Sequence, residues 1–246
     1  KLARGHHAAM PFEDVPAFIA DLREREAVAA LALALVSLVA LAGCGVSSRS
    51  SRDGLPPDAA LRYVALGDSY TIGTSVAAAE RFPDQLVASL GPEPPTLELV
   101  ANLGVNGYTS DDLIRQELPA LDALGPEFVT VLIGVNDVVQ GVPLERYRAN
   151  AVMILDALVD RLPPERIVVV AIPDYTVTPA GADYGDPLAR SASIQGANAE
   201  MERLASLREI AFVDIFDISR AAATDRALVA DDGLHPSGAQ YARWVE

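Results

Sequence analysis

The chain is poor in the residues that build disulfides, zinc sites and nucleic-acid-binding surfaces. It has one cysteine, Cys44, in 246 residues, which excludes an internal disulfide framework and a zinc site of the CxxC type. Basic residues are also few: 19, nearly all of them arginines scattered singly, stand against 34 acidic residues and leave a net charge of −15. Because there is no basic stripe or cluster, we expect no nucleic acid partner. Half of the residues are hydrophobic, which suits one globular domain with a substantial core.

The single cysteine closes a run of apolar and small residues. Residues 27–43 carry no charge, and the run ends in Leu-Ala-Gly directly before Cys44. This ending resembles the lipobox of bacterial lipoproteins, which implies cleavage before Cys44 and lipidation of its thiol. The run is short for a transmembrane helix of about 20 residues but long enough for the core of a signal peptide. The arginines that precede it alternate with glutamates, so an uncleaved anchor and a chance match stay open as alternatives.

Three parts of the chain follow from this pattern. We expect an N-terminal extension with the signal segment over 1–44 and a folded domain over 61–246, whose last helix is cut short at Glu246. Residues 45–60 between them are rich in Ser, Gly and Pro without apolar periodicity, which predicts a flexible tether. We therefore expect an exported lipoprotein, held at a membrane on the cell surface or in the periplasm.

The folded part alternates short apolar runs with helical patterns. An alternation of this kind predicts an α/β fold, a three-layer α/β/α sandwich around a parallel sheet of about five strands. In such sheets, ligands bind at the carboxyl ends of the strands. A long loop over 173–187 is expected at the same edge, as a wall of the substrate site. The predicted strands are 62–66, 97–101, 128–133, 167–172 and 211–215, and the predicted helices are 82–90, 110–118 (with Ser110 as N-cap), 143–161 and 188–208.

Two short segments carry the residues of a nucleophilic site. Ser69 follows the first predicted strand, and His235, the only histidine beyond residue 7, follows Asp232 by three residues. A serine hydroxyl is a weak nucleophile near neutral pH and needs a base, which in turn needs a group that orients it. These residue types predict acyl transfer, with Ser69 as nucleophile, His235 as general base and Asp232 as the residue that orients the imidazole.

Four segments in order resemble the sequence blocks of the SGNH/GDSL hydrolase superfamily. The resemblance covers about residues 61–241 and implies that superfamily's flavodoxin-like fold. It also implies an oxyanion hole made of the backbone N–H of Ser69, the backbone N–H of Gly107 and the side-chain amide of Asn136, with neither a metal nor an organic cofactor. The four segments are Gly-Asp-Ser-Tyr at 67–70, Asn-Leu-Gly-Val-Asn-Gly at 102–107, Gly-Val-Asn-Asp at 134–137 and Asp-Gly-Leu-His at 232–235.

Several of these residues have a plainer interpretation. Ser69 could cap a helix, Gly107 and Asn136 could be ordinary turn residues, and Asp231 competes with Asp232 at a spacing one residue longer. Tyrosines in the predicted site loops could line a substrate pocket or simply pack there: Tyr70, Tyr108, Tyr175 and Tyr184.

The predicted function is a serine esterase that forms an acyl-enzyme on Ser69. It would be lipase- or lysophospholipase-like or specific for short acyl groups, with a carbohydrate O-acetylesterase as the alternative. The partners expected are a small-molecule, lipid or glycan ester and the membrane through Cys44, and we expect a monomer. A catalytically silent, surface-tethered binding module is the alternative from another class. A metallophosphoesterase is disfavoured, because one histidine cannot supply the ligands of two metals.

Overall fold

The computed structural model describes residues 60–91 and 95–246. The predicted signal segment with Cys44, and the predicted tether up to residue 59, lie outside the described residues. Among the helices that the model does describe, none is both long and apolar enough to cross a membrane.

A five-stranded parallel sheet in the order β2-β1-β3-β4-β5 forms the centre of the domain. Strands β1 and β3 consist almost wholly of apolar residues and are buried on both faces, as parallel strands covered by helices require. The predicted α/β fold is thereby confirmed, although three strands end one or two residues earlier than predicted. The strands are β1 (Leu61–Gly67), β2 (Leu97–Asn102), β3 (Phe128–Leu132), β4 (Ile167–Val170) and β5 (Ala211–Val213).

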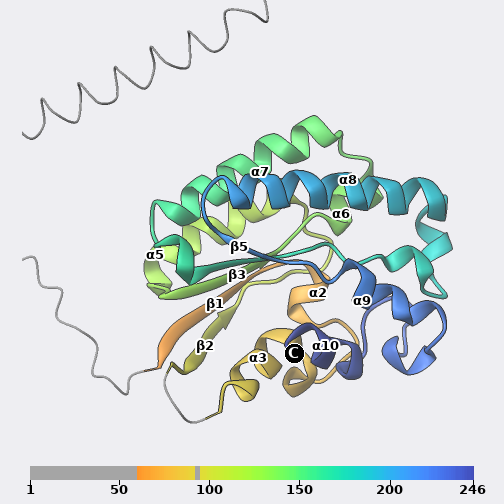
Figure 1. Ribbon diagram of the computed structural model, residues 1–246, viewed down its shortest axis with the longest axis horizontal. Helices are drawn as coiled ribbons and strands as arrows, with labels where there is room; N and C mark the ends of the chain where they lie inside the picture. The colour runs from red at the N-terminus through yellow and green to blue at the C-terminus, as the bar shows by residue number, and fades with distance from the viewer. Residues whose placement is uncertain (1–59, 92–94) are drawn as a thin grey trace, which may run out of the picture. The chain divides into compact units, whose positions relative to one another are not determined.

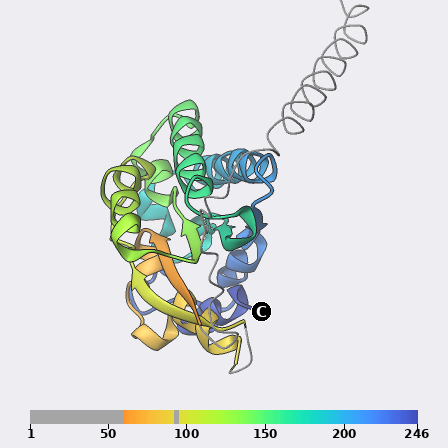
Figure 2. The same cartoon turned by 90° about the vertical axis from the view of Figure 1, so that its left-hand side faces the viewer.

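Helices cover both faces of the sheet (Figure 1). One layer contains α5 (Leu121–Leu124), α6 (Val135–Gln140), α7 (Leu144–Val159) and α8 (Pro187–Ser206), and the other contains α2 (Ser69–Ile72), α3 (Phe82–Ser89), α9 (Phe216–Arg220) and α10 (Gly238–Trp244). Figure 2 shows the same layers after a quarter turn. Ile154 of α7 and Ile194 of α8 are fully buried against the strands, and each such side chain contributes roughly 1.5–3 kcal/mol through its burial. Short 3-10 helices lie at Ala78–Glu80, Pro164–Arg166, Tyr175–Val177, Gly181–Tyr184, Ala221–Ala223 and Arg226–Leu228.

The helix predicted over 110–118 is broken into short turns. Only α4 (Ser110–Asp112) is α-helical, and it is followed by a π-helical turn (Leu113–Glu117) and a 3-10 turn (Leu118–Ala120). A π-turn accommodates one extra residue, and here it turns both of its end residues, Leu113 and Glu117, into the interior. The helix is capped by Thr109, not by the predicted Ser110, whose side chain is used elsewhere.

The segments that carry the predicted chemistry meet at one edge. Strands β1, β2 and β3 are parallel and adjacent, so their carboxyl ends lie side by side. The segments after these three strands hold Ser69, Gly107 and Asn136 respectively. Sheet topology thus brings together three residues that are far apart in the sequence.

Candidate active site

The candidate nucleophile stands where strand β1 turns into helix α2. The N-cap of α2 is Asp68, whose carboxylate accepts a hydrogen bond of 3.0 Å from the backbone N–H of Tyr70. Asp68 therefore fills the capping role that was the plainer interpretation of Ser69. Gly67, with φ of 149°, leaves no room for a side chain, since a Cβ there would lie 2.2 Å from the carbonyl oxygen of Leu132.

Ser69, His235 and Asp232 form a continuous hydrogen-bonded chain. Nε2 of His235 lies 2.9 Å from Oγ of Ser69, and Nδ1 of His235 lies 2.6 Å from Oδ2 of Asp232. Both distances are within the range at which a base takes a proton from a nucleophile and a carboxylate orients that base. The imidazole thus contacts the acid three residues before it in the sequence, Asp232.

Asp232 is held by four hydrogen bonds. Its Oδ1 accepts from the backbone N–H groups of Leu234 and His235, both at 2.9 Å, and its Oδ2 accepts from the hydroxyl of Ser75 at 2.7 Å and pairs with the His235 imidazole. Partial burial alone would raise the pKa of Asp232, but these four bonds together lower it to about 2. Asp232 is therefore a carboxylate at any pH at which an esterase is assayed.

The histidine loop is fixed from two sides. Val229 and Pro236 pair as an antiparallel bridge, and the N–H of Ala230 donates to the carbonyl of His235 at 2.8 Å. On the other side, the ring of Tyr70 packs against the imidazole with 5.1 Å between ring centres. The imidazole is thus held in place before any substrate arrives.

Three potential donors surround the space next to Ser69. Among the described residues, the backbone N–H groups of Ser69 and Gly107 have no hydrogen-bond acceptor, so both are free for a ligand. The amide Nδ2 of Asn136 donates to the carbonyl of Tyr108 at 2.9 Å and makes a long contact of 3.5 Å with the carboxylate of Asp68. An amide nitrogen carries two hydrogens, so one is fully used and the other is only weakly held.

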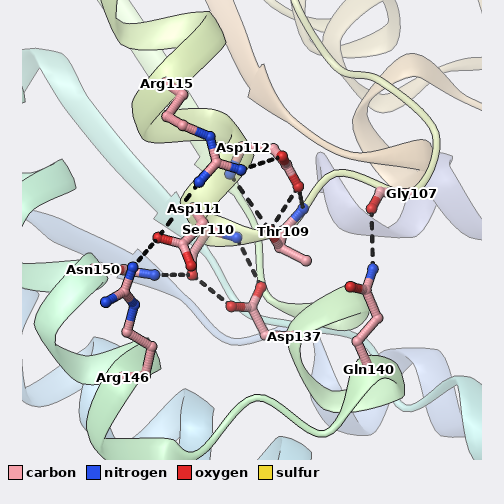
Figure 3. Close-up of polar contacts among 10 residues, drawn as sticks. All are labelled: Gly107, Thr109, Ser110, Asp111, Asp112, Arg115, Asp137, Gln140, Arg146 and Asn150. Atoms are coloured by element: carbon pink, nitrogen blue, oxygen red, sulfur yellow. Dashed lines mark hydrogen bonds and ion pairs between the residues drawn. The ribbon is translucent and has the colours of Figure 1, made fainter.

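The glycine at 107 is required by its backbone conformation. Its φ is +83°, in the region that favours glycine, while a Cβ there would meet no atom of the described residues within 4 Å. Steric room is therefore not what limits this position in the free protein. The carbonyl of Gly107 accepts a hydrogen bond of 3.4 Å from Gln140 of α6 (Figure 3).

A buried polar network joins the Gly107 loop to the helix that carries Asn136 (Figure 3). The carboxylate of Asp137 accepts from both the backbone N–H and the hydroxyl of Ser110, and Asn150 of α7 donates to the same hydroxyl at 2.9 Å. Burial raises the pKa of Asp137, and the hydrogen bonds from Ser110 oppose that shift. Two of the candidate oxyanion donors are thus tied to one framework.

Two buried acids lie behind the nucleophile turn. Asp68 is fully buried and Glu117 is 2% exposed. One oxygen of Glu117 accepts from the N–H of Gly67 at 2.9 Å, while the other has no partner among the described residues. Burial raises the pKa of Asp68 to about 7 and that of Glu117 to about 8. Glu117 was not among the predicted site residues, and the sequence marks it only as an acidic residue at helical spacing from Leu113 and Leu121.

A small pocket opens beside Ser69 and His235, with a volume of about 170 Å³. Of the tyrosines left open by the sequence, Tyr70, Tyr175 and Tyr184 line it, the last two from the predicted 173–187 wall, and Tyr108 does not. Val135, Val139 and Leu234 complete its apolar surface. The pocket is therefore mostly apolar, with the potential donors at one side.

Arg190 of α8 fastens the pocket wall to helix α6. Its guanidinium donates to the carbonyls of Val138 and Val139 at the end of α6 and, at 3.2 Å, to the carbonyl of Tyr184. A larger cavity of about 320 Å³ lies between α6, α7 and α8, but neither Ser69 nor His235 lines it.

In residues 60–91 and 95–246, no three His, Cys, Asp or Glu side chains converge as metal ligands would.

Comparison with known proteins places these observations in a family. The model of the GDSL-like lipase/acylhydrolase family matches residues 65–243. A search of the curated proteins found no match.

Solved structures with the same fold include three proteins of low sequence identity. LAE5, an α/β hydrolase from the metagenome of Lake Arreo, is 22% identical with a TM-score of 0.57, over 75% of this chain and 92% of that one. Axe2, an acetylxylan esterase from Geobacillus stearothermophilus, is 21% identical with a TM-score of 0.58, over 75% and 91%. TesA is 19% identical with a TM-score of 0.55, over 75% and 93%. At these identities the likeness concerns the fold.

Proposed function

Because the chain belongs to the GDSL-like lipase/acylhydrolase family, we propose that it hydrolyses carboxylic esters through an acyl-enzyme on Ser69. The observation that carries the proposal is the hydrogen-bonded chain from Ser69 Oγ to His235 Nε2, at 2.9 Å, and from His235 Nδ1 to Asp232 Oδ2, at 2.6 Å. The match of the family model over residues 65–243 supports the same assignment.

In the first half of the reaction, Oγ of Ser69 attacks the ester carbonyl carbon while Nε2 of His235 takes the hydroxyl proton. The carbonyl electrons move to oxygen, and the N–H groups of Ser69 and Gly107 with the weakly held amide hydrogen of Asn136 stabilise that charge. The tetrahedral intermediate then collapses, and Nε2–H of His235 protonates the departing alkoxide. The products are the alcohol and an ester of Ser69.

In the second half, water attacks the Ser69 ester and gives its proton to His235 Nε2. Collapse of this intermediate breaks the bond to Oγ, which takes the proton back from His235, and the carboxylic acid leaves. Throughout, Asp232 accepts the Nδ1–H of the imidazole and stabilises the imidazolium, for which it must be ionised. The low pKa of Asp232 meets that requirement. No cofactor enters these steps.

The pocket favours a short acyl group. Its volume of about 170 Å³ is small, and a small pocket suits an acetyl to butyryl chain better than a palmitoyl chain. This argues for a short-acyl esterase over a lipase- or lysophospholipase-like enzyme.

A carbohydrate O-acetylesterase is the second candidate. The ring of Tyr184 lines the pocket and is 40% exposed, so it could stack on a sugar ring while the acetyl group enters the pocket. The name of Axe2, an acetylxylan esterase, supports the same idea for a protein of this fold.

We also propose that Cys44 carries a lipid and tethers an exported enzyme to a membrane, on the strength of the lipobox-like sequence before it. The Cys44→Ser variant, expressed in a bacterium, should leave the membrane fraction for the soluble fraction with unchanged turnover. Attachment that persists in the variant would favour a spanning anchor and overturn lipidation.

The activity itself is tested with p-nitrophenyl esters from acetate to palmitate. We expect the parent chain to be fastest on acetate to butyrate and Ser69→Ala to be inactive on all of them. Ser89→Ala, which removes an exposed hydroxyl on α3, is the matched control and should equal the parent. Equal, negligible rates in the folded parent and in Ser69→Ala would favour a silent binding module. A palmitate optimum would restore the lipase interpretation.

A further inference from the structure

The turn after α2 contains a backbone conformation that side chains rarely adopt. Ser75 has a φ of +68°, and among the described residues only Glu209 is another non-glycine residue with positive φ. Such a conformation is unfavourable for a residue with a side chain, and it persists where neighbouring interactions determine it. Ser75 lies six residues after Ser69, which raises the question of what holds it there.

Ser75 is held by the acid of the proposed triad. Its hydroxyl donates to Oδ2 of Asp232 at 2.7 Å, and the same oxygen pairs with Nδ1 of His235 at 2.6 Å. The preceding residue, Thr74, donates to the side chain of Asn106 at 2.6 Å, beside the candidate oxyanion glycine. One turn after the nucleophile therefore contacts both the acid and the oxyanion loop.

The hydroxyl of Ser75 restrains Oδ2, the less firmly held oxygen of the Asp232 carboxylate. Oδ1 of Asp232 is fixed by two backbone N–H groups, whereas Oδ2 has, within residues 60–91 and 95–246, only the imidazole and Ser75 as partners. The Asp232 side chain is 29% exposed, so water can compete for Oδ2. A hydroxyl that occupies one side of Oδ2 leaves the other side directed at the imidazole.

We propose that Ser75 is a positioning residue for the catalytic acid, and that its left-handed backbone is retained because it directs the hydroxyl to Asp232. The proposal rests on the proposed function, since it needs Asp232 to act through His235. Ser75 contacts no reacting atom in this scheme. It keeps Asp232 Oδ2 aligned with Nδ1 of His235 as the imidazole gains and loses its proton.

Two substitutions separate the hydroxyl from the backbone. Ser75→Ala removes the hydroxyl and keeps the strained conformation, while Ser75→Gly removes the hydroxyl and relieves the strain. We expect both to lower kcat on p-nitrophenyl acetate by about 10-fold with KM unchanged, because the lost interaction acts in the transition state. Ser75→Gly should melt at or above the Tm of the parent, and Ser75→Ala should melt below Ser75→Gly.

Glu209→Gly is the matched control, since it relieves the same kind of strain at a residue outside the site. It should raise Tm and leave kcat unchanged. If Ser75→Ala fails to fold, Ser75→Gly carries the test alone. Parental kcat in both Ser75 variants would overturn the proposal.

A double-mutant cycle distinguishes positioning of Asp232 from a general structural role. On an Asp232→Ala background, Ser75→Gly should lower kcat no further, because the residue it positions is gone. A second 10-fold loss on that background would show that Ser75 acts otherwise and would overturn the proposal. Ser69→Ala distinguishes failure of this proposal from failure of the proposed function. Activity in Ser69→Ala would overturn the proposed function. An inactive Ser69→Ala together with fully active Ser75 variants would overturn only the role of Ser75.

Discussion

The carboxyl groups on the two sides of the site have opposite environments. Behind the nucleophile turn, Asp68 and Glu117 are 0% and 2% exposed, and burial raises their pKa values to about 7 and about 8. On the histidine side, the Asp232 side chain is 29% exposed and its pKa is lowered to about 2. The same functional group thus has a raised pKa on one side of the site and a lowered pKa on the other.

The difference follows from the number of donors. Counting partners in the described part of the chain, Asp232 has four hydrogen bonds, whereas the nearly fully buried Glu117 has a single backbone donor. A carboxyl that must stabilise an imidazolium needs to be charged, and donors secure that charge. A carboxyl that only holds a backbone N–H in place can do so in its neutral form. Asp232 is therefore held as a charged group by its hydrogen bonds, and Glu117 is held as a buried group. Only Asp232 takes part in the proposed chemistry.

Removing the residues of the histidine side should have the largest effect. His235→Ala is expected to lower kcat by roughly 10⁴-fold, because the domain has no other histidine to act as base. Asp232→Ala should cost less, roughly 10²- to 10³-fold, since the Val229–Pro236 bridge and the Tyr70 ring still hold the imidazole. Asp231→Ala, one residue away, is the matched control and should equal the parent. A larger loss in Asp231→Ala than in Asp232→Ala would reverse the assignment.

Removing the side-chain donor of the oxyanion site comes next. Asn136→Ala should lower kcat by about 10²-fold with little change in KM, as expected for a donor that acts on a charge formed in the transition state. Steady-state kinetics on p-nitrophenyl acetate measure it. If KM rises instead and kcat stays, Asn136 binds the ground state and is no oxyanion donor.

On the nucleophile side, the buried acid predicts an effect on stability. The pKa of Glu117 is raised in the folded state. Its contribution to the free energy of unfolding is therefore fully present below the unfolded pKa of about 4.5 and is lost as pH rises through about 8. Glu117→Gln, which keeps an acceptor for Gly67 but cannot ionise, should therefore unfold in urea with a free energy higher by roughly 1–3 kcal/mol than the parent at pH 9. Parallel pH profiles of the two proteins would show that Glu117 is not buried as described.

The smallest effect concerns the stability of the protein at acid pH, through Asp232. The pKa of Asp232 is lowered in the folded state, so its contribution to the free energy of unfolding is present above the unfolded pKa of 3.8 and is lost as pH falls through about 2. The difference in urea midpoint between the parent and Asp232→Asn should shrink from pH 4 to pH 2, opposite in sign to the trend for Glu117. A constant difference over that range would contradict the low pKa.

Much of this site could be predicted from the sequence, because its residues lie in short segments beside recognisable strands. The apolar runs predicted the five strands, and the resemblance to the SGNH/GDSL sequence blocks implied that Ser69, Gly107 and Asn136 contribute to one oxyanion hole. The spacing of Asp232 and His235 lies within one turn and needed no tertiary information. The lipid on Cys44 stays a prediction, because that residue lies outside the described part of the chain.

The contacts that join distant segments could not be predicted. Ser75 and Asp232 are 157 residues apart, and Glu117 reaches Gly67 over 50 residues, so neither pairing leaves a local pattern. The π-turn that buries Glu117 also breaks the 3.6-residue period on which the predicted helix over 110–118 relied. Positioning residues are thus less visible in a sequence than the residues they position.

The central claim, that Ser69 is a nucleophile activated by His235, is tested most directly by covalent labelling of the full chain. The protein would be treated with diisopropyl fluorophosphate and digested, and the modified peptide would be identified by mass spectrometry. We predict one label per chain, on Ser69, with loss of esterase activity in proportion, and no label in His235→Ala. A label on another residue, or full activity with Ser69 labelled, would contradict the account.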